Sequence, residues 1–133
     1  RLYARRPLPP PPAEALPWDG RGPLTVSGLG RLSVVEVRGR GLSPGRVGAE
    51  GLVVRFGASG RRCRPLGRGG SRSLKKLFQE AGVPPWERRH RPLVFRGEAL
   101  AGVPGLCVDE AFAAGADEWG LELHWQPVDG HGQ

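Results

Sequence analysis

The sequence lacks Ile, Met and Asn, has only two cysteines in 133 residues, and contains no apolar run near the roughly 20 residues of a membrane-spanning helix. The spacing of Cys63 and Cys107 excludes a zinc site of the CxxC type. A disulfide between them stays open, but we expect two buried free thiols, as is usual in the cytoplasm. No secretory signal precedes the first prolines, so we expect a cytoplasmic protein without membrane contact.

Lysine is scarce as well, since the chain has 18 Arg and 2 Lys. Together with 22 Gly, 14 Pro and much Ala, this bias is typical of a GC-rich coding sequence, so the glycine and proline content does not by itself predict disorder. Four Trp and four Phe are available for a core. The length suits one domain rather than two, and the missing initiator Met indicates a piece of a longer chain.

Acidic side chains are rare in the middle of the chain, and basic ones are absent from its end. Residues 55–96 carry twelve basic and two acidic side chains, whereas residues 97–133 carry seven acidic side chains and no Lys or Arg. The net charge of residues 55–96 is therefore larger than the net charge of the whole chain, which is +7. This polarity predicts a molecule with one basic side and favours a phosphate-rich partner such as RNA. A solvated basic face that serves only solubility is the alternative.

The prolines suggest where the folded part begins. Six of them lie within residues 7–17, a composition that favours extended polyproline structure. We therefore divide the chain into a proline-rich linker with the end of a preceding domain over residues 1–20, a folded domain over 21–128, and a tail over 129–133. Recognition of the prolines by a partner domain is the alternative to a plain linker.

Short alternating patterns predict an α+β domain in which short, mostly antiparallel strands accompany one main helix. The helix is expected over residues 73–82, with Leu74, Leu77, Phe78 and Ala81 in one buried stripe. Ser71 or Ser73 would cap its start and Gly82 its end. The expected strands are residues 24–26 and 32–37 in a hairpin, 52–56, 61–64 as a continuation of the same sheet, 93–95 and 99–103 around a turn, and 121–125.

The run from Arg61 to Lys76 is the strongest candidate for a binding site. The first turn of the expected helix holds Lys75 and Lys76 without an acid, although cations at this end oppose the helix dipole. Natural sequences break such a stability rule mainly at functional sites. Gly69 and Gly70 would let backbone amides, helix end and basic side chains converge on phosphates. No P-loop or GxGxxG pattern is present, and a capped surface helix with solvated cations is the alternative.

The segment after the helix adds an aromatic residue and further arginines. Trp86 is expected to fold back and seal the helix against the sheet, with stacking on an exposed base as the alternative. Arg88 and Arg89 are the better RNA candidates. We refer to the nine residues expected to contact RNA as the basic strip: Arg61, Arg62, Arg64, Arg68, Arg72, Lys75, Lys76, Arg88 and Arg89.

No catalytic constellation is visible in the sequence. His90, His124 and His131 have no Ser or Cys nearby in a recognisable nucleophile motif. The acidic pairs at residues 109–110 and 117–118 are interpreted as solvated surface acids rather than an acid–base pair. We therefore expect no catalytic residue, no metal ligand and no cofactor in this chain.

A longer motif connects the chain to a known family. The run SLKKLFQEAGVPPWERR at residues 73–89, followed by RPLVF at 91–95, VPGLCV at 103–108 and a closing segment at 121–126, resembles the C-terminal domain of bacterial tRNA(Ile)-lysidine synthetases. With Val54–Phe56 upstream, the resemblance covers about residues 20–127, and residues 1–12 resemble the exit from the preceding domain. Residues 60–64 depart from the family, because they read GRRCR where paired glycines are common.

The resemblance implies an enzyme that uses ATP to activate the wobble cytidine of tRNA(Ile) with a CAU anticodon and joins lysine to it. ATP with Mg, and lysine, would bind the missing N-terminal domain, whose SGGxDS loop does not occur in these residues, so this chain alone is expected to be inactive. For this domain the resemblance implies recognition of the tRNA acceptor stem, and a fold similar to a β-rich domain of the phenylalanyl-tRNA synthetase β chain.

A second hypothesis does not involve RNA. The basic strip would instead dock on an acidic protein surface, either a neighbouring domain of the same enzyme or a partner subunit. The acid-rich segment from residue 98 to residue 122 would even complement the strip of another copy. The oligomeric state stays open.

Overall fold

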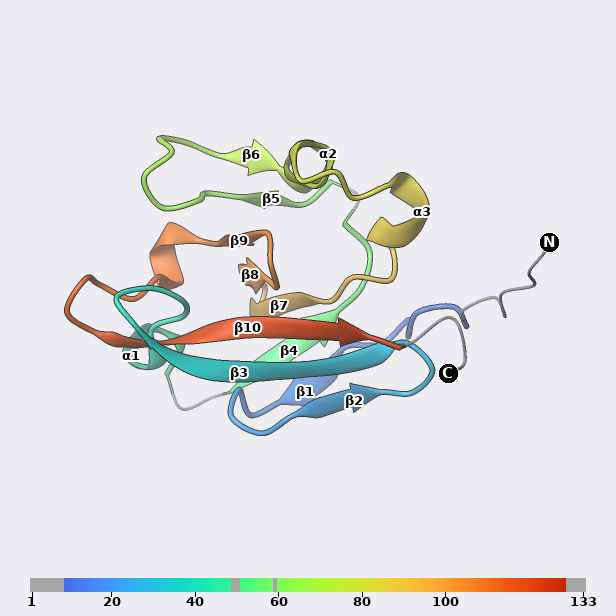
Figure 1. The fold of residues 1–133 in the computed structure, drawn as a ribbon, viewed down its shortest axis with the longest axis horizontal. Coiled ribbons are helices and arrows are strands. Elements are labelled where there is room, and N and C mark those ends of the chain that lie inside the picture. Colours follow the sequence, from blue (N-terminus) through green and yellow to red (C-terminus); the bar gives the residue numbers. More distant parts are fainter. Residues whose placement is uncertain (1–8, 49–50, 59, 129–133) are drawn as a thin grey trace.

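The computed structural model describes residues 9–48, 51–58 and 60–128, in which every strand pairing is antiparallel (Figure 1). The strands are β1 (Leu16–Trp18), β2 (Leu24–Val26), β3 (Gly30–Arg38), β4 (Leu52–Arg55), β5 (Arg62–Cys63), β6 (Arg72–Ser73), β7 (Leu93–Arg96), β8 (Ala99–Val103), β9 (Cys107–Val108) and β10 (Trp119–Pro127). The helices are α1 (Pro44–Val47), α2 (Leu74–Glu80), α3 (Pro85–Arg88) and the 3-10 helix η1 (Glu110–Phe112).

The elements form three layers. The middle layer is a five-stranded sheet in the order β1-β4-β7-β8-β9, and one of its faces packs against a three-stranded sheet in the order β10-β3-β2. The third layer consists of the β5–β6 hairpin and α2 on the opposite face of the middle sheet. Figure 1 shows β5, β6 and α2 on one side of β7 and β8, with β10 and β3 on the other.

The alternation along β7 explains why the middle sheet has two cores. Leu93 and Phe95 point toward α2, whereas Val94 between them points toward the three-stranded sheet, and all three are buried. A strand that is covered on both faces is apolar throughout rather than alternating with polar residues. The run LVF at residues 93–95 therefore marks the centre of the molecule.

Most of the expected elements are present. The hairpin of β2 and β3, the strand at β4, the β7–β8 hairpin and the final strand β10 confirm the patterns from which they were predicted. The expectation that residues 61–64 continue the main sheet is wrong, because β5 pairs only with β6. Both edges of β4 are already occupied, by β1 and by β7, so no edge is free for the next strand.

The main helix begins where the sequence predicts it. Ser73 is the N-cap of α2, and Gly82 takes the left-handed conformation after its end, with φ of 77°. Leu74, Leu77 and Phe78 are buried as expected. Ala81 is exposed, contrary to the expected stripe, because the helix ends at Glu80.

The sheet begins earlier than the expected linker would allow. Leu16–Trp18 pairs with β4 as the edge strand β1, and Trp18 is only 6% exposed. An edge strand tolerates Pro17, because one side of such a strand needs no backbone donor. At the other end, the expected tail over 129–133 lies outside the described residues. None of the helices in the described ranges is long and apolar enough to cross a membrane.

Candidate nucleic-acid interface

The β5–β6 hairpin continues directly into α2, and the three elements form one unit. Arg62 pairs with Ser73 and Cys63 with Arg72, so the short strands place Cys63 in the core and leave Arg62 exposed. The unit is closed at the helix start, where the Leu74 backbone N–H donates to the Arg61 carbonyl at 2.9 Å. Alternation along two-residue strands thus separates an apolar face from a basic one.

The base of the β5–β6 loop is attached to the acid-rich end of the chain. The Arg64 backbone N–H donates to the Asp109 carboxylate at 3.1 Å, and the Glu110 N–H donates to the Arg64 carbonyl at 2.8 Å. Pro65 and Asp109 form an isolated antiparallel bridge beside them. Asp109 therefore holds the basic loop in place, a role that no local sequence signal indicates because the two segments are 45 residues apart.

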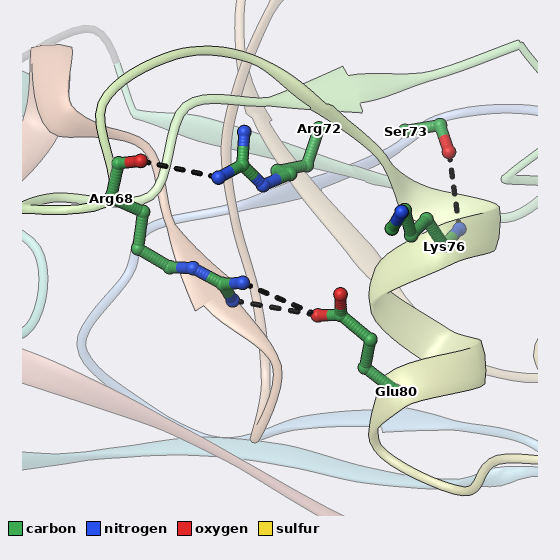
Figure 2. Close-up of polar contacts among 5 residues, drawn as sticks. All are labelled: Arg68, Arg72, Ser73, Lys76 and Glu80. Atoms are coloured by element: carbon green, nitrogen blue, oxygen red, sulfur yellow. Dashed lines mark hydrogen bonds and ion pairs between the residues drawn. The ribbon is translucent and has the colours of Figure 1, made fainter.

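Hydrogen bonds inside the loop restrain two of its arginines. Arg62 Nε donates to the Ser71 hydroxyl at 2.7 Å. An Arg72 amino group donates to the Arg68 carbonyl at 3.2 Å, as Figure 2 shows. The Arg68 guanidinium extends across the loop to the Glu80 carboxylate on the last turn of α2, 3.5 Å away. These contacts give the loop a defined shape, because they restrain guanidinium groups that would otherwise sample many rotamers.

Two glycines let the loop turn. Gly69 and Gly70 have φ of 66° and 120°, values that residues with a Cβ rarely adopt, and the space around Gly69 is open. The glycines that the sequence suggested for close approach to a ligand thus have a structural use, which is to reverse the chain between β5 and β6.

The start of α2 is capped rather than open. The Ser73 hydroxyl accepts a hydrogen bond from the Lys76 backbone N–H at 3.1 Å, and the first turn contains no acidic residue. Lys75 and Lys76 are exposed. The cap already satisfies one helix-end donor, and α2 has only seven residues. The positive charge of this region therefore comes from the basic side chains rather than from the helix dipole.

The structure brings most of the basic strip together. Seven of its nine residues belong to the β5–β6–α2 unit, and residues 60–79 contain no acid. Arg61 lies with its guanidinium 4.8 Å from the centre of the Phe95 ring. Arg88 and Arg89 follow at the end of α3, where Arg88 Nε donates to the Val83 carbonyl at 2.9 Å and Arg89 is exposed.

Trp86 does not fold back. Its side chain is 72% exposed, so the expectation that it seals the helix against the sheet is wrong. Val83, buried in the core cluster beneath α2, fills that position instead. The reason is the pair of prolines before Trp86, which start α3 as a separate turn and direct its first side chains to solvent.

The acidic residues near the chain end have structural partners. The Ser43 hydroxyl and the Gly115 N–H both donate to Glu118, and these bonds lower the pKa of its carboxyl below the usual value. Glu122 accepts from Arg40 at 2.9 Å and contacts His124 at 3.1 Å, and these two partners lower the pKa of Glu122 in the same way. Glu118 and Glu122 thus contribute to the packing of the segments that they join.

The two cysteines form no disulfide and lie close to each other. Cys63 is buried and Cys107 is half-buried. A hydrogen bond between the two side chains, together with burial, raises the pKa of the Cys63 thiol. A thiol held in its protonated form is a poor nucleophile, so Cys63 belongs to the packing of the second core.

A cavity of about 640 Å³ opens beside the loop base, between Pro65 and Leu66, the turn from β8 to β9, and Leu123–Trp125 of β10. Its charged side chains are Arg40, Arg91 and Glu122, none of which belongs to the basic strip. Arg40 pairs with Glu122, and Arg91 pairs with Glu87. Across the described ranges, no group of three His, Cys, Asp or Glu side chains is arranged to hold a metal ion.

Of the three histidines considered in the sequence, His124 pairs with Glu122, and His90 has its Nε2 buried without a hydrogen-bond partner. His131 lies outside the described residues. Nothing in the described part of the chain joins a histidine to a nucleophile.

A family model and individual relatives point to the same family of proteins. Residues 52–125 match the family described as the TilS substrate C-terminal domain. The chain is 43% identical over 86% of its length to a tRNA(Ile)-lysidine synthase of Alkalilimnicola ehrlichii, and 38% identical over 83% of its length to one of Methylococcus capsulatus. It spans about a quarter of the length of these relatives.

A solved structure shows the same fold. The chain is similar to a crystal structure of a TilS C-terminal domain, with a TM-score of 0.59 and 22% identity, over 87% of this chain and 99% of that one.

Proposed function

This chain belongs to the TilS substrate C-terminal domain family, and on that basis we propose that it is the tRNA-binding, non-catalytic C-terminal part of a tRNA(Ile)-lysidine synthase. In this proposal the complete enzyme is the ATP-dependent ligase that joins lysine to the wobble cytidine of tRNA(Ile) with a CAU anticodon. Lysine, and ATP with Mg, would bind outside this chain. The likeness to a phenylalanyl-tRNA synthetase domain stays a prediction.

The observation that carries the proposal is the basic β5–β6–α2 unit. It gathers seven cations without an acid between residues 60 and 79, and the apolar face of the same unit anchors it on the middle sheet. Phosphate contacts from Arg and Lys supply most of the affinity for a nucleic acid and position it without reading sequence. Such a surface suits the backbone of a tRNA acceptor stem, which is a regular duplex.

The charges are spread along the unit rather than directed into one pocket. Arg64 and Arg68 lie on the loop, whereas Lys75 and Lys76 lie on α2, and the nearby cavity is lined by none of them. A single bound nucleotide would need convergent groups in a concave site. An extended polyanion is the ligand that this arrangement favours.

The test is binding of the 133-residue chain to tRNA(Ile) with a CAU anticodon, measured by fluorescence anisotropy over a series of salt concentrations. We expect affinity to fall steeply with salt. The double variant Lys75→Ala/Lys76→Ala should bind more weakly, with a salt slope smaller by about one for each phosphate that is no longer neutralised. The matched control is Arg21→Ala/Arg31→Ala, which removes two exposed cations outside the strip.

The control should keep the salt slope of the original chain, apart from a small loss from the lower net charge. Equal losses in the two double variants would overturn the assignment of the strip. Self-association that depends on salt, without any tRNA binding, would overturn the proposal in favour of docking on an acidic protein surface.

A further inference from the structure

Trp86 is the one tryptophan among the four without a partner in the described residues. Each of the other three has a hydrogen bond or a ring contact within those residues. Trp18 donates to the Gly22 carbonyl at 2.7 Å, Trp125 meets the Phe56 ring edge-on at 6.4 Å between centroids, and Trp119 lies 5.5 Å from the Arg38 guanidinium. The Trp86 indole is 72% exposed, and no hydrogen bond or ring contact within the described ranges involves it.

The segment that carries Trp86 makes contacts on both sides of this residue. Before it, the buried Val83 donates its backbone N–H to the Phe78 carbonyl at 2.9 Å, and the same residue accepts from Arg88 at its carbonyl. After it, Glu87 and Arg91 form an ion pair at 3.7 Å. The ring is therefore presented to solvent from an anchored turn, so little backbone entropy would be lost when it meets a ligand.

The surroundings of Trp86 favour an anionic partner. Arg89 is exposed in the next turn, and the one acid of α3, Glu87, is already paired with Arg91. Trp86 follows Lys76 by ten residues, four of them helical, so their Cα atoms are at most about 28 Å apart. An extended RNA that lies on the basic strip can span that distance, so one ligand can reach both.

We propose that Trp86 is a stacking platform for an unpaired or terminal base at the end of the RNA duplex whose phosphates lie on the basic strip. This inference rests on the proposed function and adds to it the part of the RNA that is recognised. Inside a duplex both faces of each base are covered by neighbouring bases, so an exposed indole can stack only at a helix end or on an unpaired nucleotide. Arg89, exposed three residues after Trp86, would contact the phosphate of that nucleotide.

The experiment uses the full chain and two RNA hairpins with the acceptor-stem sequence of tRNA(Ile), one with its unpaired 3′ nucleotides and one blunt. We expect Trp86→Ala to lower the affinity for the extended hairpin by about tenfold, and Trp86→Phe to recover most of the loss because the ring is kept. Stacking involves no counterion release, so Trp86→Ala should leave the salt slope unchanged, in contrast to Lys75→Ala/Lys76→Ala.

Tryptophan fluorescence gives a second readout. RNA should quench the tryptophan fluorescence of the original chain more strongly than that of Trp86→Phe. In this variant a phenyl ring can still stack on a base, but the indole that reports the contact is absent. The matched control is Trp119→Ala, which removes another exposed tryptophan, 56% exposed on β10, and should keep the original affinity.

The outcomes separate this inference from the proposed function. If the original chain binds the hairpins with strong salt dependence but Trp86→Ala binds equally well, the stacking role is wrong while RNA binding stands. If the loss in Trp86→Ala equals that in Trp119→Ala, the stacking role is also wrong. If the original chain binds no RNA, both proposals fall.

Discussion

Arg68 and Glu80 connect the tip of the β5–β6 loop to the end of α2, with a guanidinium nitrogen and a carboxylate oxygen 3.5 Å apart. Both side chains are nearly half-exposed, at 46% and 42%. An ion pair of this kind contributes at most about 1 kcal/mol to stability, because water and salt screen it. Its larger effect is on charge, since Glu80 neutralises one of the seven cations of the β5–β6–α2 unit.

Glu80→Gln should therefore tighten RNA binding. The substitution releases Arg68 and raises the local charge by one, so we expect affinity to rise by roughly threefold at low salt and the gain to shrink as salt increases. The free energy of unfolding should change by less than about 1 kcal/mol. Anisotropy titrations and urea unfolding measure the two quantities.

The matched control for this prediction is Glu36→Gln, which removes an exposed carboxylate from β3 in the opposite layer. If Glu36→Gln tightens binding as much as Glu80→Gln, then net charge rather than the position of Glu80 governs the affinity, and the prediction fails.

Ser73→Ala should destabilise the domain. The Ser73 hydroxyl caps α2 by accepting from the Lys76 N–H, and loss of such a cap costs about 1 kcal/mol. Urea unfolding followed by circular dichroism measures this loss. Ser73→Asp keeps the acceptor oxygen, so it should retain stability while its negative charge weakens RNA binding beside Lys75 and Lys76.

The control for the cap is Ser27→Ala, because Ser27 is exposed between β2 and β3 and its hydroxyl makes no hydrogen bond within the described residues. If Ser73→Ala and Ser27→Ala are equally stable, the cap makes no measurable contribution to the free energy of unfolding, and the prediction fails.

Glu118 makes the stability depend on pH on the acid side. Hydrogen bonds from Ser43 and Gly115 lower the pKa of its carboxyl in the folded state below the usual 4.5. A lowered pKa means that the folded state favours the carboxylate, so its stabilising contribution is complete above pH 4.5 and is lost as the pH falls through the folded-state pKa. Glu118→Gln should therefore be less stable at neutral pH and show a shallower loss of stability in acid.

Thermal unfolding midpoints of the original chain and of Glu118→Gln, taken in steps of about one unit between about pH 3 and pH 7, measure this loss of stability in acid. Glu98→Gln is the control, since Glu98 is exposed in the β7–β8 turn and has no ion pair in the described part of the chain. The prediction is contradicted if the two variants have the same pH profile.

The local elements were predictable because their signals are local. The cap at Ser73, the left-handed Gly82 and the spacing of Leu74, Leu77 and Phe78 all lie within ten residues, and α2 forms where they indicate. The separation of charge was visible for the same reason, because it depends only on which residues are close in sequence.

The errors concern long-range partners. The pairing of β5 could not be derived from its own sequence, since it depends on β1 and β7 having already occupied both edges of β4. Trp86 has an apolar side chain beside a helix end, a pattern that equally describes a buried seal, and its exposure follows from Val83 filling that place. Asp109 was interpreted as a solvated acid, because its partner Arg64 is 45 residues away.

A β-rich domain with one well-marked helix, and a basic segment that ends in this helix, could be predicted from the residues alone, because periodicity, caps and charge runs act over a few residues. The face that the cations occupy, the contacts that hold their loop and the exposure of Trp86 could be learned only from the folded chain. Those features depend on which strand edges and core positions are free after the rest of the chain has packed, and packing is a property of the whole molecule.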